Sequence, residues 1–144
     1  TTTMTRKDGI DVLIIREGAR PERKTIPATL EALQQEVGGY IEPFGLRGGA
    51  TIYCNEEGKL GRWNVNRAIR ASDVTEDGDG KIVEIMAGTF VITGFDPENG
   101  ENTSLTDAQA EHWMRRFHDP ETIMTNAVTG KWTIIPIHPY DEAR

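Results

Sequence analysis

The segment IVEIMAGTFVITGF, residues 82–95, constrains the fold more than any other stretch of this chain. It is rich in β-branched and aromatic side chains, which favour strands, and Glu84 is its one charged residue. Gly88 lies near its middle, where a glycine in a strand marks a bulge or the close approach of another backbone. The segment therefore predicts either one long bent strand or two successive strands, and either arrangement requires partners in a sheet.

Shorter runs with strand character supply those partners. Residues 10–15 read IDVLII, an apolar and β-branched run typical of a buried strand. The tail KWTIIPIHP, residues 131–139, predicts one last strand at a sheet edge, because Pro136 has no N–H to donate to a neighbour. Further strands are expected at 40–44 and 50–55, and residues 25–27 are expected to form either a short strand or an extended lead-in to the next helix.

Two segments show helical spacing of their apolar residues. Residues 29–37 place leucines and a valine on one helical face, with Thr29 as the N-cap and two glycines directly after the last turn. Residues 107–117 follow a capping box of Thr106 and Gln109 and again have an apolar face. Both helices are therefore expected to pack one side against a sheet.

Strands mixed irregularly with two amphipathic helices predict an α+β fold with a mostly antiparallel or mixed sheet. A chain of 144 residues fits one domain. We expect a disordered N-terminal segment at 1–9, an α+β core domain at 10–118, and a C-terminal extension with the edge strand at 119–144.

The formal net charge of −7 argues against nonspecific binding of nucleic acid, which needs a basic face. Cys54 is the one cysteine, so no intramolecular disulfide forms, which is compatible with a reducing cytoplasm. It lies in an apolar run and is expected to be a small buried side chain. No apolar run approaches the length of a membrane-spanning helix, so a cytoplasmic protein without a membrane partner is expected.

One acidic stretch, residues 73–84, resembles a calcium-binding loop in its spacing of carboxylates and glycine. Gly80 stands where such a loop needs an apolar residue, and a strand-like segment follows, so we interpret the stretch as a solvated acidic hairpin or loop. The histidines His112, His118 and His138 lack the spacing of a zinc site and are expected to be exposed. No metal and no cofactor is predicted.

Enzymatic motifs are also missing from the linear pattern. No serine, threonine or cysteine stands in a pattern typical of an activated nucleophile, and no glycine-rich phosphate loop follows a strand. The glycines Gly45, Gly48 and Gly49 are interpreted as turn residues. We therefore expect a protein that is not an enzyme.

The polar stretch after the 50–55 strand is the best sequence candidate for a site. Arg67 offers a planar fork of donors suited to phosphate, Asn66 offers a donor and an acceptor, and Trp63 can stack on a ring. The alternative is that Asn66 caps a short helical turn and Arg67 pairs with an acidic neighbour. The sequence leaves both interpretations open.

Four motifs resemble the domain-of-unknown-function family 3846 and occur in that family's order. They are LEALQQEVGGYIE (30–42), YCNEEGKL (53–60), NRA (66–68) and IMAGTFVITG (85–94). The resemblance covers residues 10–118 and brings no activity or catalytic residue with it. It implies a phage, mobile-element or Gram-positive bacterial origin and, by analogy, a role in counter-defence or host takeover.

The leading hypothesis is a binding protein that sequesters a nucleotide-like signal molecule. Its ligand-binding residues are expected to be Tyr40, Asn55, Trp63, Asn66 and Arg67. Two alternatives remain open: an adaptor that inhibits a host defence protein through its acidic surface, and an enzyme with an unusual polar site. A homo-oligomer joined at the strand near Trp132 is a further expectation.

Overall fold

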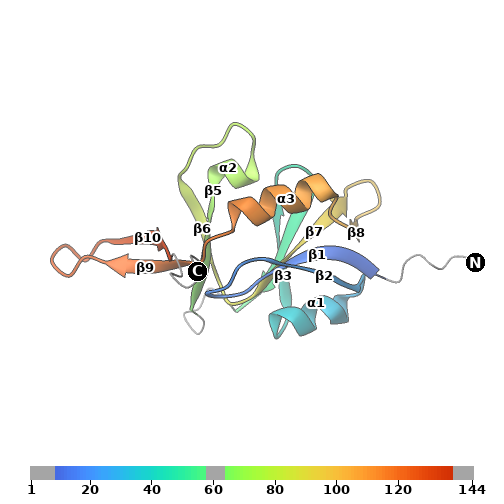
Figure 1. The fold of residues 1–144 in the computed structure, drawn as a ribbon, viewed down its shortest axis with the longest axis horizontal. Coiled ribbons are helices and arrows are strands. Elements are labelled where there is room, and N and C mark those ends of the chain that lie inside the picture. Colours follow the sequence, from blue (N-terminus) through green and yellow to red (C-terminus); the bar gives the residue numbers. More distant parts are fainter. Residues whose placement is uncertain (1–8, 58–63, 138–144) are drawn as a thin grey trace, which may run out of the picture.

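A six-stranded antiparallel sheet forms the centre of the molecule (Figure 1). The computed structural model describes residues 9–57 and 64–137. Five strands lie in the order β2, β1, β7, β4, β3, and β8 pairs with the end of β7. The strands of this sheet are β1 (Gly9–Ile15), β2 (Glu22–Pro27), β3 (Ile41–Leu46), β4 (Ala50–Asn55), β7 (Phe90–Asp96) and β8 (Glu101–Thr103).

Two hairpins and three helices complete the described residues, and the fold is α+β with antiparallel sheets, as predicted. The hairpins are β5 (Val65–Arg70) with β6 (Ile82–Ala87), and β9 (Glu121–Thr125) with β10 (Trp132–Pro136). The helices are α1 (Leu30–Val37), α2 (Ala71–Val74) and α3 (Asp107–Arg116). No helix among the described residues is long and apolar enough to cross a membrane.

The burial of strand β1 on both faces explains why residues 12–15 are apolar without interruption. Successive side chains of a strand point to opposite faces of the sheet. Leu13 and Ile15 pack in one apolar cluster with Trp113 of α3, whereas Val12 and Ile14 pack in a second cluster that includes residues of α1. The two helices therefore cover opposite faces of the sheet, as Figure 1 shows, and β1 is buried on both sides.

The segment 82–95 forms two strands that belong to different sheets. Strand β6 pairs with β5, whereas β7 lies between β1 and β4 in the central sheet. Gly88 connects them with a φ of 78°, a left-handed conformation that favours glycine. Of the two arrangements that the sequence allowed, the structure has the second, and the chain changes sheets at Gly88.

Both predicted helices are present, with the predicted caps. The Thr29 hydroxyl accepts a hydrogen bond from the Ala32 N–H at 3.1 Å, and Gly38 ends α1 with a φ of 80°. At α3, the Gln109 N–H donates to the Thr106 hydroxyl at 3.1 Å, and the Thr106 N–H donates to the Gln109 side chain at 2.8 Å. The capping box thus fixes where α3 begins and which side chains face the sheet.

The acidic stretch 73–84 is not wholly solvated, which corrects the interpretation of it as a solvated loop. Asp73 is 3% exposed and lies in α2. Its carboxylate accepts hydrogen bonds from Arg116 Nε at 2.8 Å and Nη2 at 2.9 Å, and from the Arg70 N–H at 2.7 Å. Sequence inspection missed this pair because its partners are 43 residues apart.

The C-terminal part also differs from the expectation of a single edge strand. Residues after the core domain form a hairpin in which β9, which was not predicted, pairs with β10. Pro136 is the last residue of β10, so its missing N–H does not break the hydrogen bonding between the two strands of the hairpin. The hairpin is held to the rest of the molecule by Glu121, whose carboxylate accepts a hydrogen bond from the Ala68 N–H at 2.7 Å.

Candidate functional site

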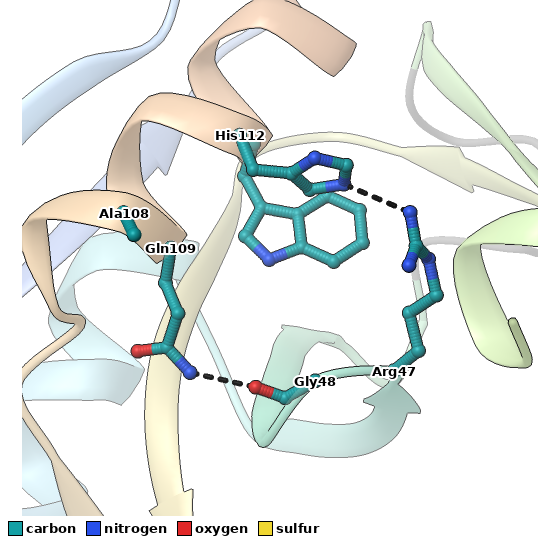
Figure 2. A pocket seen from close by; sticks show the side chains of 6 residues that line it. Arg47, Gly48, Ala108, Gln109 and His112 are labelled. Carbon is teal, nitrogen blue, oxygen red and sulfur yellow. Dashed lines mark hydrogen bonds between the residues drawn. The ribbon is translucent and has the colours of Figure 1, made fainter.

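A hollow of about 200 Å³ lies between the β3–β4 turn and helix α3 (Figure 2). We refer to it as the arginine hollow. Figure 2 shows Arg47 and His112 facing each other on one side of it and Gln109 reaching toward Gly48 on the other. It is lined by Arg47, Gly48, Ala108, Gln109, His112 and Trp113.

The local sequence positions both walls. Gly48 and Gly49 have φ values of 75° and 80°, so the tight turn after β3 depends on two glycines. Gln109 follows from the capping box of α3, and its Nε2 donates to the Gly48 carbonyl at 2.7 Å. The Gln109 side chain therefore both caps α3 and binds the turn, so it fixes the position of the turn relative to the helix.

Arg47 is the unusual residue of this site. Its side chain is half-buried, and its Nε is buried with no hydrogen-bond partner. Its Nη2 lies 3.5 Å from His112 Nε2, at the outer limit for a hydrogen bond. Within residues 9–57 and 64–137, no carboxylate forms an ion pair with Arg47. A guanidinium has five N–H donors, so several are available to a ligand.

His112 adds a neutral hydrogen-bonding group to the site. Burial is the main cause that lowers the pKa of the His112 imidazole. The charges of Arg47 and Arg115 lower this pKa further, whereas the charge of Asp73 raises it. The ring is therefore neutral at neutral pH and can accept a hydrogen bond from Arg47 or donate one to a ligand. It stands edge-on to Trp113, with ring centroids 4.4 Å apart, which fixes its orientation. The expectation that His112 is an exposed helix residue is wrong, because it is half-buried.

The other cation beside the site is already neutralised. Arg116 is paired with the buried Asp73 carboxylate, as described above, and its guanidinium also lies 4.6 Å from the centre of the Phe117 ring. Arg47 is thus the cation that lines the hollow, and no carboxylate among the described residues pairs with it. Beside the apolar side chains of Ala108 and Trp113, the hollow is lined by a guanidinium, an imidazole, an amide and peptide groups, which are suited to holding an anion.

Two of the predicted site residues lie in the interior instead. Asn66 and Arg67 are both fully buried in β5. The Asn66 amide donates to the carbonyls of Ile15 at 2.9 Å and Gly88 at 2.8 Å. These bonds tie the β5–β6 hairpin to the central sheet. The alternative that Asn66 caps a helical turn is wrong, because Asn66 lies in β5, whereas ligand binding by Asn66 stays a prediction.

Arg67 is a structural cation. Its Nε and Nη2 donate to the Phe117 carbonyl at 3.0 and 2.8 Å, Nη2 donates to the Ala19 carbonyl at 2.6 Å, and Nη1 donates to the Asn66 side-chain oxygen at 2.7 Å. Burial lowers the pKa of the Arg67 guanidinium to about 10, opposed by the nearby Glu121 carboxylate, so it stays charged at neutral pH. It joins β5, the loop after β1 and the end of α3.

The remaining predicted residues are placed elsewhere. Asn55 is buried at the end of β4, where its amide donates to the Val37 carbonyl at 3.2 Å. Tyr40 lies beside it, because the Glu56 N–H donates to the Tyr40 carbonyl at 3.0 Å, and its side chain is 71% exposed. Trp63 lies outside the described residues. Whether a ligand contacts Tyr40 or Asn55 stays a prediction.

Sequence reasoning missed the arginine hollow. Arg47 and His112 are 65 residues apart, and each taken alone looks like an ordinary surface residue. Two signals in the sequence belong to this site. The paired glycines at 48 and 49 were interpreted as turn residues, and the capping-box glutamine was interpreted as part of a helix start. Nothing in the pattern showed that the two elements meet. No cluster of metal-ligating side chains occurs in the part of the chain that the structure describes.

Comparison with known proteins places the chain in a family. The model of the family described as Domain of unknown function (DUF3846) matches residues 10–118, which confirms the resemblance that the sequence motifs indicated. No curated protein and no solved structure matches the chain. The family description names no activity, so the function is inferred from the geometry of the site.

Proposed function

The chain belongs to the DUF3846 family, and we propose that it is a binding protein that holds a nucleotide-like anion at the arginine hollow. In this proposal it is encoded by a phage or mobile element and acts in counter-defence or host takeover by sequestering a nucleotide signal. The ligand's phosphate occupies the space between Arg47, His112 and Gln109.

The observation that carries the proposal is the incomplete bonding of Arg47. A charged group that is partly removed from water lowers its free energy by finding an acceptor, and a buried donor without one costs about 1–3 kcal/mol. Arg47 Nε is such a donor, in a protein whose net charge is −7. Acidic residues are therefore plentiful in the sequence, and yet none in the described part of the chain pairs with this arginine. The Nη groups of the same guanidinium are the donors that an anionic ligand in the hollow would reach, since the Nε is closed to solvent.

The size of the hollow supports a phosphate group more than a whole nucleotide. Pockets that enclose a complete small molecule measure about 300–1,000 Å³. At about 200 Å³, the arginine hollow fits the phosphate and part of a sugar, so the base lies across the surface beside it. The side chains of the lining include no hydroxyl, thiol or carboxylate, which favours binding over covalent chemistry.

Calorimetric titration with a panel of nucleotides tests the proposal. The panel contains mononucleotides, cyclic dinucleotides and ADP-ribose, each beside the nucleoside that lacks phosphate. We expect binding by one phosphate-bearing class and none by its nucleoside. Replacing Arg47 by Gln removes one or two charge-assisted hydrogen bonds of about 1.5–3 kcal/mol each, so affinity falls by roughly tenfold to hundredfold or more.

The matched control is Arg20→Gln, which removes the same charge from an exposed position between β1 and β2 that does not line the hollow. It should change affinity by at most about a fewfold, because exposed charges at a distance are screened. Equal losses in both variants would mean that the ligand responds to net charge and not to this site. Recovery of the ligand intact after incubation supports sequestration, whereas a changed ligand would indicate an enzyme. No binding by any anion would favour the adaptor that acts on a host protein.

A further inference from the structure

The arginine hollow is closed at both ends, which restricts the kind of phosphate that fits it. At one end Arg47 Nη2 lies 3.5 Å from His112 Nε2, and at the other Gln109 Nε2 donates to the Gly48 carbonyl at 2.7 Å. Figure 2 shows these four residues around the hollow, two from the β3–β4 turn and two from α3. Trp113 also lines it and is 2% exposed, so the indole belongs to its inner wall. The hollow therefore opens to solvent on one side.

The wall that carries Arg47 is held in place by two further contacts. The Arg47 N–H donates to the Asp73 carbonyl at 2.9 Å, and the Phe95 N–H donates to the Gly49 carbonyl at 2.9 Å. The β3–β4 turn is thus tied to α2 by one bond and to β7 by the other. A ligand meets walls that are already in position, so it has to fit the hollow as it stands.

The shape of the hollow suits a phosphate at the end of a ligand. A phosphate monoester has one ester link, so the phosphate enters the hollow while the rest of the molecule stays at the mouth. The phosphorus of a diester is linked in two directions, and both links have to leave a hollow of about 200 Å³ through the same opening. A diester therefore stays at the mouth, farther from the Nη groups of Arg47.

The charges of the hollow also match a monoester. Arg47 supplies one permanent positive charge, and His112 supplies a second when its imidazole takes up a proton. A phosphate monoester carries a charge of about −1.5 to −2 at pH 7. A diester phosphate carries about −1. The extra negative charge of the monoester is therefore the one that a protonated His112 pairs with.

The surroundings of His112 keep the imidazole neutral until such an anion arrives. Burial is the largest cause that lowers its pKa. The charged groups around the ring are Arg47, Arg115 and Arg116, which lower the pKa further, and Asp73, which raises it. An anion held beside the ring favours the charged imidazolium, so the pKa of His112 rises when the ligand binds. Binding of a monoester therefore takes up a proton from solution.

We propose that the arginine hollow selects nucleotides that end in a phosphate monoester over those whose phosphates are all diesters, with Arg47 and His112 as the partners of that phosphate. This rests on the proposed function and narrows its ligand class. Nucleoside monophosphates bind well, whereas cyclic nucleotides and cyclic dinucleotides bind weakly. Arg47 binds phosphates of both kinds, and His112 is the residue that distinguishes them.

Calorimetric titration of the whole chain tests the proposal. The ligands are the 5′-monophosphates of adenosine, guanosine, cytidine and uridine, each beside its 3′,5′-cyclic form, which has the same base and sugar but a diester. We expect one monophosphate to bind at least about tenfold more tightly than its cyclic form, because it makes one more charge-assisted hydrogen bond. Titrations at about pH 7 in buffers of different ionisation enthalpy should show uptake of up to about one proton per monophosphate bound, and less for the cyclic form.

Two histidine variants separate His112 from a general effect of histidine charge. His112→Gln keeps a hydrogen-bonding side chain that takes up no proton, so it should bring the two affinities close together and remove the proton uptake. The matched control is His118→Gln, the same change at an exposed histidine just beyond α3 that does not line the hollow. It should keep both the preference and the proton uptake.

The outcomes that contradict this selection differ from those that contradict the proposed function. If the cyclic form bound as tightly as the monophosphate, or a cyclic dinucleotide alone bound, and Arg47→Gln removed that binding, the selection would be wrong and the anion site would stand. Proton uptake that persists unchanged in His112→Gln would also contradict the selection, because another group would then hold the second charge. If no nucleotide bound, both proposals would be wrong.

Discussion

Replacing Arg67 tests whether this buried arginine holds the fold together or serves a ligand. The Arg67→Ala variant leaves four acceptors without this donor: the carbonyls of Phe117, Ala19 and Asn66 and the side-chain oxygen of Asn66. Each unsatisfied buried acceptor costs about 1–3 kcal/mol. Water in the vacated space and relief from burying the charge offset part of this sum. We expect a net loss of about 3–4 kcal/mol in the free energy of unfolding, at the lower end of the range for breaking buried charge networks.

Urea denaturation followed by circular dichroism measures this loss, and thermal unfolding gives a second reading. For a chain near this length, about 1 kcal/mol corresponds to roughly 3 °C, so the midpoint should fall by about 10 °C. Arg67→Lys keeps the charge but not the planar fork, and it should lose about half as much as the alanine variant.

The control variant is Arg70→Ala in the same strand. Arg70 donates one exposed hydrogen bond, to the Gly80 carbonyl at 2.7 Å, so its removal should cost at most about 1 kcal/mol. If Arg67→Ala were as stable as Arg70→Ala, the structural role assigned to Arg67 would be wrong. If the Arg67→Ala variant were stable but no longer bound the nucleotide, the binding site would lie at Arg67, as the sequence predicted, and not at the arginine hollow.

Two further predictions follow from the ionic groups around α3. Asp73→Asn should lower the free energy of unfolding by about 2 kcal/mol, less than for a fully buried pair, because the Arg116 side chain is 22% exposed; urea denaturation beside wild type measures it. The pKa of His112 is lower in the folded state than its usual value, so the unfolded chain takes up the proton first as pH falls. Stability should therefore decrease below about pH 6.5, and His112→Gln should remove that part of the decrease in thermal unfolding scans. An identical pH profile in the variant would show that His112 is not the group responsible.

Much of the fold was predictable because local patterns and the tertiary structure agree. The apolar run of β1 is buried on both faces, and the caps at Thr29 and Thr106 set the helix starts where propensity places them. These features depend on residues within a few positions of one another. Hydrophobic spacing and capping chemistry are local, so one sequence is enough to read them.

Strand β5 was missed for the opposite reason. Its sequence VNRAIR contains Asn66 and Arg67, and a charged residue is almost never fully buried unless it is paired. Here the partners of Arg67 are main-chain carbonyls at Phe117 and Ala19, about fifty residues away, and no sequence pattern marks a carbonyl as an acceptor. Asn66 and Arg67 therefore looked like residues of a surface site, and the sequence did not indicate that they belong to a buried strand.

The arginine hollow was out of reach for a related reason. The β3–β4 turn and α3 meet through a hydrogen bond from Gln109 to Gly48, which depends on how the whole sheet places the two elements. The decisive property of Arg47 is a missing partner, and a missing partner is visible only when the neighbours are known.

The central claim is that an anion bonds to Arg47, and the nitrogen resonance of its side chain tests it most directly. In ¹H–¹⁵N spectra of the labelled protein, the Arg47 Nε–H signal, assigned by its loss in Arg47→Gln, should shift on addition of the nucleotide that binds most tightly. The matching nucleoside should leave it in place. If the nucleotide binds while the Arg47 signal stays unchanged, and signals from Tyr40 or Asn55 move instead, the arginine hollow is not the binding site.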